Sequence, residues 1–321
     1  MRAILLREGG GIRLADIPDA PRPGVGEIRI AMRLTPVNPA DHLAVEGRHL
    51  TDAYGMQKPV GAEGLGIVEA IGPGVQGLAV GDRILPLDRG NWVERRTIPA
   101  DRVIRAPDML ADEQASIFRI NPATAHRLLT RVDLCEGDWI IQNAAGSMVG
   151  RIITAIGKAR GLNILCVVRS PELARERLST LGAAAVIAQG ETMADEAIAA
   201  MEGARARLAL DFVTGEETGR LARCIGPGGR VTISGHLGKE PCLIPGTLLT
   251  TGNIIIDGYS LRMDEGPAGR TQLQAMYDRL APIYRDNPAV LPELVRCPLA
   301  AFEDAVTWRG PEKLLLDWTR I

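Results

Sequence analysis

Between residue 139 and about residue 258, short apolar runs alternate with segments of helical periodicity, and this alternation constrains the fold most strongly. Helices are expected at 149–160 and at 171–181, where Pro171 stands in the first turn and Gly182 ends the helix. The runs expected to be buried strands are 139–142, 163–168, 184–187, 208–213 and 230–234. This succession predicts a parallel sheet that is covered on both faces.

The first hundred residues are rich in glycine and proline and are expected to form a barrel-like, all-β module. Residues 27–34 alternate with period two, which predicts a half-buried strand. Residues 66–74 are expected to be a strand that runs into a turn, and residues 81–87 another short strand. Beyond the parallel-sheet region, a helix is expected near 271–285 and an apolar run closes the chain at 313–318.

Composition limits the classes of function. The 321 residues predict about two domains, and 46% hydrophobic with 24% charged residues is typical of a soluble globular protein. Because 37 Lys and Arg balance 39 Asp and Glu, we expect no basic face for nucleic acid or anionic lipid. No run is long enough to span a membrane, and the first residues reach charge and glycine too early for a signal peptide. A cytoplasmic protein with a small-molecule substrate is expected.

Neither the cysteines nor the histidines have the spacing of a metal site. The five cysteines are odd in number and contain no Cys-x-x-Cys pair, and the four histidines are scattered. We therefore predict no metal. His42 and His126 are expected to be structural, and Asp211 is expected to be a strand-end or turn residue rather than an acid catalyst.

The segment Asn143-Ala144-Ala145-Gly146-Ser147-Met148-Val149-Gly150 lies between a predicted strand and a predicted helix. A dinucleotide site has G-x-G-x-x-G at this point, so that backbone amides at a helix N-terminus approach a pyrophosphate. Only Gly150 matches, with Ala145 and Ser147 at the other two glycine positions. Small residues still permit close approach, and the Ser147 hydroxyl can bond to phosphate. The alternative is a tight turn without a ligand.

The end of the next strand, Val167-Val168-Arg169-Ser170, favours NADP over NAD. NAD-binding proteins place an acidic residue there for the ribose 2′-hydroxyl, whereas an arginine accommodates the 2′-phosphate of NADP. Here the first acidic residue is Glu172, and the Arg169 guanidinium can bind phosphate through paired hydrogen bonds. A solvated surface arginine is the alternative.

At this point the chain resembles the medium-chain dehydrogenase/reductase superfamily over essentially its whole length. Residues 61–68 with Gly72 and Gly81-Asp82 resemble the superfamily's barrel signature. Asn38-Pro39-Ala40-Asp41, residues 121–125 and residues 141–144 resemble the NADPH-dependent trans-2-enoyl thioester reductases and their quinone-reductase relatives. The resemblance implies an α/β Rossmann domain with a doubly wound parallel sheet, residues 120–259, inserted in a GroES-like β-barrel catalytic domain, residues 1–119 plus 260–321.

The resemblance also implies the residues that bind the cofactor, NADPH. Position by position they are Asn121, Thr124, Gly146, Ser147, Met148, Val149, Arg169, Ser170, Ser234, Gly235, His236, Leu237, Tyr259, Ser260, Leu261 and Lys313. Zinc-dependent alcohol dehydrogenases share the scaffold, but they have a cysteine at the position of Asn38 and a histidine at the position of Ala62. Without a Lewis acid to stabilise an alkoxide, reduction of an electron-poor double bond or ring is expected instead.

The catalytic proton donor is the point at which the chain departs from the resemblance. A tyrosine is thought to protonate the α-carbon in the enoyl thioester reductases, and His49 stands at that position here. An imidazolium can donate a proton near neutral pH, and Tyr54 lies five residues further on. His49 is therefore a candidate catalytic acid, a wall of the substrate pocket or a solvated loop residue. If neither side chain donates, water can protonate a quinone product.

The leading hypothesis is an NADPH-dependent reductase of a trans-2-enoyl thioester or related enone. The first alternative is an NADPH:quinone oxidoreductase, the second a non-catalytic cofactor-binding protein, and the third an alcohol dehydrogenase with an unrecognised metal site. A homodimer is expected because members of the superfamily are commonly dimers and because residues 253–257 can form an exposed edge strand.

Overall fold

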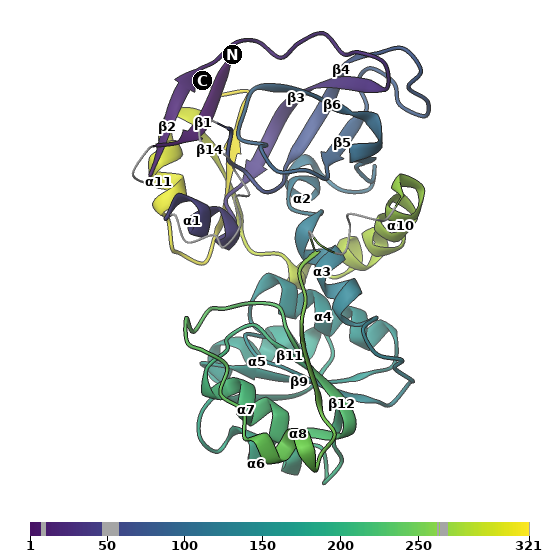
Figure 1. Ribbon diagram of the computed structural model, residues 1–321, viewed down its shortest axis with the longest axis vertical. Coiled ribbons are helices and arrows are strands. Elements are labelled where there is room, and N and C mark those ends of the chain that lie inside the picture. Colours follow the sequence, from purple (N-terminus) through teal and green to yellow (C-terminus); the bar gives the residue numbers. More distant parts are fainter. Residues whose placement is uncertain (8–10, 47–57, 262, 264–268, 321) are drawn as a thin grey trace. The chain divides into compact units, whose positions relative to one another are not determined.

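The computed structural model describes residues 1–7, 11–46, 58–261, 263 and 269–320. The chain divides into two compact units (Figure 1). The mixed-sheet unit comprises Met1–Ile120, Ala268–Ala281 and Pro292–Ile321, and the parallel-sheet unit comprises Asn121–Pro267 and Pro282–Leu291. The division passes through helices α3 (Ile120–Leu128) and α10 (Arg270–Asp286), in the second case at Pro282. The bounds expected from the resemblance, 1–119 plus 260–321 and 120–259, stay a prediction.

The parallel-sheet unit has six strands in the order β10-β9-β8-β11-β12-β13, and every neighbouring pair is parallel. In chain order this is 3-2-1-4-5-6, the arrangement of doubly wound nucleotide-binding sheets. The strands are β8 (Trp139–Gln142), β9 (Asn163–Val168), β10 (Ala183–Ala188), β11 (Ala206–Asp211), β12 (Ile225–Ile233) and β13 (Ile255–Gly258). Consecutive residues of β9 and β11 are buried, so both faces are covered, and the predicted parallel sheet is confirmed.

Helices alternate with these strands, as the sequence predicts. They are α4 (Met148–Ala159), α5 (Pro171–Thr180), α6 (Met193–Ala200), α7 (Glu216–Arg223) and α8 (Gly246–Thr250). The 3₁₀ turn η2 (Pro288–Val290) also belongs to this unit but follows the last strand of its sheet and α10. Pro171 occupies the first turn of α5. Gly182, which follows α5, has φ +96°, and a Cβ there would lie 2.5 Å from Cδ of Lys158. Only glycine fits this turn.

The mixed-sheet unit contains a seven-stranded sheet, in which β14-β15-β3-β4-β5-β7 are neighbours and β6 also pairs with β3, and a separate β1–β2 hairpin. The strands are β1 (Arg2–Leu6), β2 (Ile12–Asp16), β3 (Glu27–Pro36), β4 (Leu65–Ile71), β5 (Arg83–Pro86), β6 (Arg95–Pro99), β7 (Val103–Arg105), β14 (Leu294–Pro298) and β15 (Lys313–Asp317). The unit also has helices and 3₁₀ turns: α1 (Pro39–Val45), η1 (Ala100–Arg102), α2 (Asp112–Ser116), η3 (Leu299–Ala301) and α11 (Phe302–Thr307).

The three strands predicted in the first hundred residues are confirmed as β3, β4 and β5, but the expectation of an all-β module is wrong. Helix α1 begins after Asn38 because Pro39 is preorganised for the first turn and the Asp41 carboxylate accepts the backbone N–H of Asn38 at 2.9 Å. Such a short helix depends on its cap more than on hydrophobic periodicity, so the apolar pattern does not show it.

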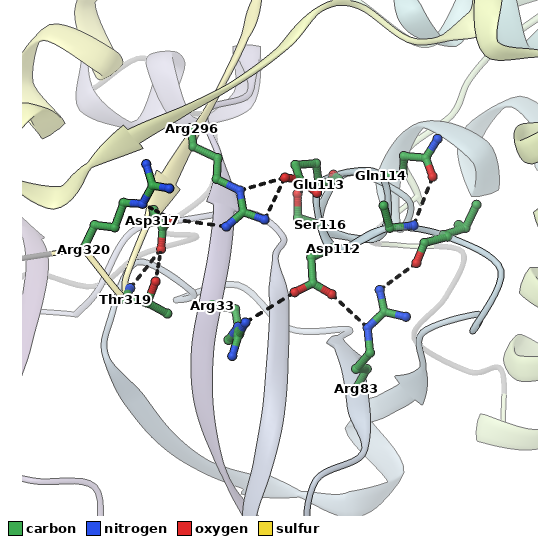
Figure 2. A network of polar contacts seen from close by, with 12 residues as sticks. Arg33, Arg83, Asp112, Glu113, Gln114, Ser116, Arg296, Asp317, Thr319 and Arg320 are labelled. Atoms are coloured by element: carbon green, nitrogen blue, oxygen red, sulfur yellow. Dashed lines mark hydrogen bonds and ion pairs between the residues drawn. The ribbon is translucent and has the colours of Figure 1, made fainter.

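An ion-pair network joins the last strands of the mixed-sheet unit to α2 (Figure 2). Arg296 on β14 contacts Glu113 at 2.7 Å and Asp317 on β15 at 3.4 Å. The neighbouring Asp112 contacts Arg83 on β5 at 3.0 Å. The network ties β14 and β15 to strands that precede them by about two hundred positions in the chain.

Each unit has its own apolar core. One core packs β1, β3 and β15 around Trp92, and the other packs β8, β9 and β11 against α6 and α7. Among the helices of the described residues, none is long and apolar enough to cross a membrane.

Candidate active site and nucleotide site

The loop between β8 and α4 has the geometry of a phosphate-binding turn. Ser147 is the N-cap of α4, and its hydroxyl accepts the backbone N–H of Gly150 at 3.3 Å. Ala144 adopts a left-handed conformation with φ 47°, which turns the chain toward the helix. Gly146 is exposed, and no acidic residue lies in the first turn of α4. The positive end of a twelve-residue helix is therefore open to an anion.

Gly150 allows α4 to pack on this loop. A Cβ at Gly150 would lie 2.7 Å from both Cα and the carbonyl oxygen of Ala145, which is fully buried. The Gly150 carbonyl in turn accepts a hydrogen bond from the side-chain amide of Gln142 at 2.9 Å. The third glycine of the motif is thus required by packing, whereas the first position tolerates Ala145.

A buried polar link joins β8 to β11, the two strands between which the strand order reverses. The Asn143 amide donates to Oδ1 of Asp211 at 2.7 Å and accepts the N–H of Phe212 at 2.7 Å. Asp211 is fully buried and also accepts the N–H groups of Val213 and Thr214, each at 2.9 Å. It organises the turn after β11, as expected of a strand-end residue. Ligands of doubly wound sheets bind at such a reversal point.

The structure brings most of the other predicted cofactor residues to the carboxyl edge of the same sheet. Arg169 follows β9 directly, is exposed, and pairs with no carboxylate in the described part of the chain. His236 follows β12, and its Nδ1 lies 3.0 Å from the Thr214 hydroxyl. At this edge the predicted residues are Gly146, Ser147, Met148, Val149, Arg169, Ser170, Ser234, Gly235, His236, Leu237, Tyr259, Ser260 and Leu261.

Two predicted cofactor residues, Asn121 and Thr124, belong instead to α3. The Asn121 amide lies 3.5 Å from Sδ of Met148, at the start of α4. The last one, Lys313, begins β15 of the mixed-sheet unit. The candidate proton donors His49 and Tyr54 lie outside the described residues.

Lys313 belongs to a buried polar cluster that also contains Asn38 and Glu63. The Asn38 amide lies between two charges: its Oδ1 accepts from Nζ of Lys313 at 2.6 Å, and its Nδ2 donates to Oε1 of Glu63 at 3.0 Å. The other Glu63 oxygen accepts the backbone N–H of Ile120 at 2.9 Å. Arg119 donates to the carbonyl of Ala62 at 3.4 Å.

Burial disfavours both charges of this cluster. It raises the pKa of Glu63, an effect opposed by Lys313, the Ile120 N–H and Arg119. Burial likewise lowers the pKa of Lys313, although Glu63 and Asp41 favour its charged form. The neighbouring His42 on α1 has a lowered pKa, first because of burial and then because Arg309 and Lys313 are close. Such perturbed groups commonly mark functional sites.

Sequence reasoning missed Glu63 and Arg119. Glu63 is a charged residue within the otherwise small and apolar run Val60–Ile67, and this isolation was a signal that could have identified it. A carboxylate amid apolar neighbours is costly unless it is paired. Arg119 follows the buried pair Ile117-Phe118, but its pattern alone carries no comparable signal.

The donor set around Asn38 does not fit a zinc ion. Both polar atoms of the Asn38 amide are used, and the Lys313 ammonium 2.6 Å from its oxygen would repel a cation. Ala62, at the other position that the alcohol dehydrogenases use for zinc, offers only a methyl group. Among the described residues, no three His, Cys, Asp or Glu side chains are placed to hold a metal together.

Two family models match the chain: the alcohol dehydrogenase GroES-like domain over residues 24–108 and the zinc-binding dehydrogenase family over residues 149–280. The mitochondrial enoyl-[acyl-carrier-protein] reductase of Xenopus tropicalis is 31% identical over 296 residues, which cover 88% of this chain and 84% of that protein. The protein of the same name from Dictyostelium discoideum is 31% identical over 268 residues, 81% and 76% of the two chains.

Solved structures of similar fold cover nearly all of the chain. A putative NADPH:quinone reductase from Bacillus thuringiensis has a TM-score of 0.83 at 24% identity and covers 98% of both chains. The Etr1p complex with NADP and crotonyl-CoA has a TM-score of 0.84 at 23% identity and covers 98% and 99%. At these identities the likeness concerns the fold. With the family models and the two relatives, each matched over three quarters or more of its length, it shows that the chain belongs to the medium-chain dehydrogenase/reductase superfamily, in the branch that includes the enoyl-[acyl-carrier-protein] reductases.

Proposed function

We propose that the protein is an NADPH-dependent reductase of an activated C=C bond, with a trans-2-enoyl thioester or a related enone as substrate. The observation that carries this proposal is the 31% identity, over most of both chains, to a relative named enoyl-[acyl-carrier-protein] reductase. The solved Etr1p complex, whose fold is similar, contains NADP and crotonyl-CoA. A zinc-dependent reaction is not proposed, because the donors at Asn38 and Ala62 do not suit the metal.

The residues at the carboxyl edge of the parallel sheet fit the cofactor. The open N-terminus of α4 and the Ser147 hydroxyl suit the pyrophosphate, and the exposed Arg169 suits the 2′-phosphate. When bound, NADPH supplies the hydride. The β-carbon of the substrate accepts it, the electron pair of the double bond moves toward the thioester carbonyl, and the α-carbon then takes a proton from His49 or Tyr54.

Steady-state kinetics with crotonyl thioester and with a benzoquinone, each with NADPH, test the proposal. We expect kcat/KM to favour the thioester by more than about tenfold, which corresponds to about 1.4 kcal/mol. A preference for the benzoquinone would support a quinone reductase. NADPH binding without turnover of either compound would support a non-catalytic protein. Either of these two outcomes would overturn the proposal.

We also propose a cytoplasmic homodimer. The argument for the dimer is the edge strand β13, whose Ile255 side chain is 44% exposed although it lies in an apolar run. Sedimentation of wild type and of Ile255→Lys tests the dimer, since a charge at a paired edge should give monomers. Microscopy of the tagged protein in its own cell tests the location.

A further inference from the structure

A cavity of about 370 Å³ lies within the mixed-sheet unit. It shares no lining residue with the Asn38 cluster or with the proposed cofactor site. The loop after β2, the segment that begins at Lys58 and strand β6 form its walls. Its charged lining is strongly biased toward cations: Lys58, Arg89, Arg95 and Arg96 against a single carboxylate, Asp19.

Two of these cations form no ion pair among the described residues, although the nearby Asp88 favours the charged form of Arg96. Arg95 is paired with Glu69 at 3.1 Å, and Asp19 is 82% exposed and pairs with the backbone amine of Met1. By contrast, Arg96 and Lys58 have no carboxylate within ion-pair distance in the described ranges. The cavity therefore retains an excess of positive charge.

The Arg96 guanidinium is held at the cavity wall by a fixed amide. Its Nη1 donates to Oδ1 of the fully buried Asn91 at 2.6 Å. The Asn91 amide nitrogen donates to the carbonyls of Asp88 at 2.8 Å and Gly61 at 3.3 Å, so the oxygen must face Arg96. Gly90, which precedes Asn91, has φ +93°, a backbone conformation that favours glycine.

Among the described residues, most N–H donors of Arg96 have no acceptor from the protein. A guanidinium carries five N–H donors, and Asn91 is the one protein acceptor that Arg96 has among the described residues. Burial lowers the pKa of Arg96 to about 10, which leaves it cationic at neutral pH. Asp88, the carboxylate that favours the Arg96 charge, is itself paired with Arg102 at 2.7 Å, so a bound anion would further offset the cost of burying this cation.

We propose that this cavity is a second anion site, which binds the phosphate or carboxylate group of a small metabolite. Arg96 supplies a fork that matches either oxyanion, and Lys58 supplies a second charge. The proposal is independent of the reductase function, because no residue is shared with the proposed cofactor site.

Isothermal titration with inorganic phosphate, and separately with citrate, tests the proposal on the full chain at constant ionic strength. Saturating NADP⁺ is present so that the proposed cofactor site does not contribute. We expect saturable binding of one of the two anions, weakened about tenfold or more in Arg96→Gln. The matched control is Arg22→Gln, an exposed arginine next to the cavity that does not line it. It removes the same charge and should change the affinity by less than about twofold.

Two further variants keep the test decisive. If Arg96→Gln fails to fold, the exposed Lys58→Gln should still weaken the same binding. In Arg169→Ala, titrated without NADP⁺, the anion should bind as in wild type, which separates this site from the proposed cofactor site. Absence of saturable binding of both anions, or equal losses in Arg22→Gln and Arg96→Gln, would overturn the proposal.

Discussion

Nζ of Lys313 donates to Oδ1 of Asn38 at 2.6 Å, although the two residues are 275 positions apart in the chain. The other end of the same amide donates to Glu63, so Asn38 separates a buried cation from a buried anion and hydrogen-bonds to both. An aspartate would place a second carboxylate beside Glu63, and an apolar residue would leave both charges without this partner. The chemistry of the position therefore requires an amide.

Replacement of this amide should destabilise the protein. In Asn38→Leu, Lys313 and Glu63 each lose a hydrogen bond inside the protein, which should reduce the free energy of unfolding by about 1–3 kcal/mol. Denaturant unfolding measures the change. Asn163→Leu is the control, because its amide bonds a single carbonyl, that of Gly137, at an exposed position. Equal losses in the two variants would show that Asn38 does not bridge the charges.

Local patterns predicted the parallel sheet and two of its helices, α4 and α5, but gave no bounds for α6, α7 and α8. The strand expected at 163–168 is β9 with the same bounds, and the helix expected at 149–160 is α4, shifted by one residue. Apolar periodicity and caps act over a few residues, so one sequence shows them directly. The short α1 was missed because its start is determined by a cap rather than by an apolar stripe.

The candidate site could be predicted only in part. Arg169 and Ser147 could be proposed from the sequence because each stands at a fixed distance from a recognisable strand or helix start; their role in cofactor binding stays a prediction. The pairing of Lys313 with Asn38 and Glu63 depends on β15 lying antiparallel to β3, a contact across the whole chain that no local pattern encodes. Lys313 was expected from the resemblance, but its buried partners were not.

Gly150 should not tolerate a side chain. In Gly150→Ala the added methyl group would lie 2.7 Å from Cα and the carbonyl oxygen of Ala145, which is too close, and the loop would shift away from α4. We expect weaker NADPH binding and a lower Tm, measured by titration and by calorimetry. Gly246→Ala, at the start of α8 and outside the proposed cofactor site, is the control, since no atom lies within 4 Å of its added Cβ. If both variants bind NADPH as wild type does, the close packing of Gly150 is not required.

Arg169 should distinguish the two nicotinamide cofactors. Arg169→Ala removes a guanidinium that can bond the 2′-phosphate, so the Kd for NADPH should rise by about tenfold or more while that for NADH stays the same. Fluorescence titration with both cofactors measures this. Arg175→Ala, an exposed arginine on α5, controls for general charge. Equal weakening of NADPH and NADH by Arg169→Ala would remove the 2′-phosphate role.

The proton donor can be identified by two substitutions outside the described residues. His49→Ala should lower kcat by about a hundredfold or more and leave the Kd for NADPH unchanged, because a general acid acts on the substrate. Tyr54→Phe removes only a hydroxyl and should have little effect if His49 is the donor. Single-turnover kinetics of crotonyl thioester reduction separates the chemical step from binding. An unchanged rate in His49→Ala, with a loss in Tyr54→Phe, would assign the role to Tyr54.

The Asp317 network should contribute to stability at neutral pH and lose this contribution in acid. Burial alone would raise the pKa of Asp317, but hydrogen bonds from Thr319 and the charge of Arg296 lower it below 3.8. Because the folded state holds the proton less tightly than the unfolded state, the stabilisation is present above about pH 3.8 and is lost as the pH falls through the folded pKa.

Asp317→Asn should therefore be less stable than wild type at pH 7, and the difference should shrink toward pH 3. Urea unfolding at a series of pH values measures it. Asp286→Asn, at an exposed pair with Arg285, should follow the wild-type curve, and a pH-independent difference for Asp317→Asn would contradict the electrostatic explanation.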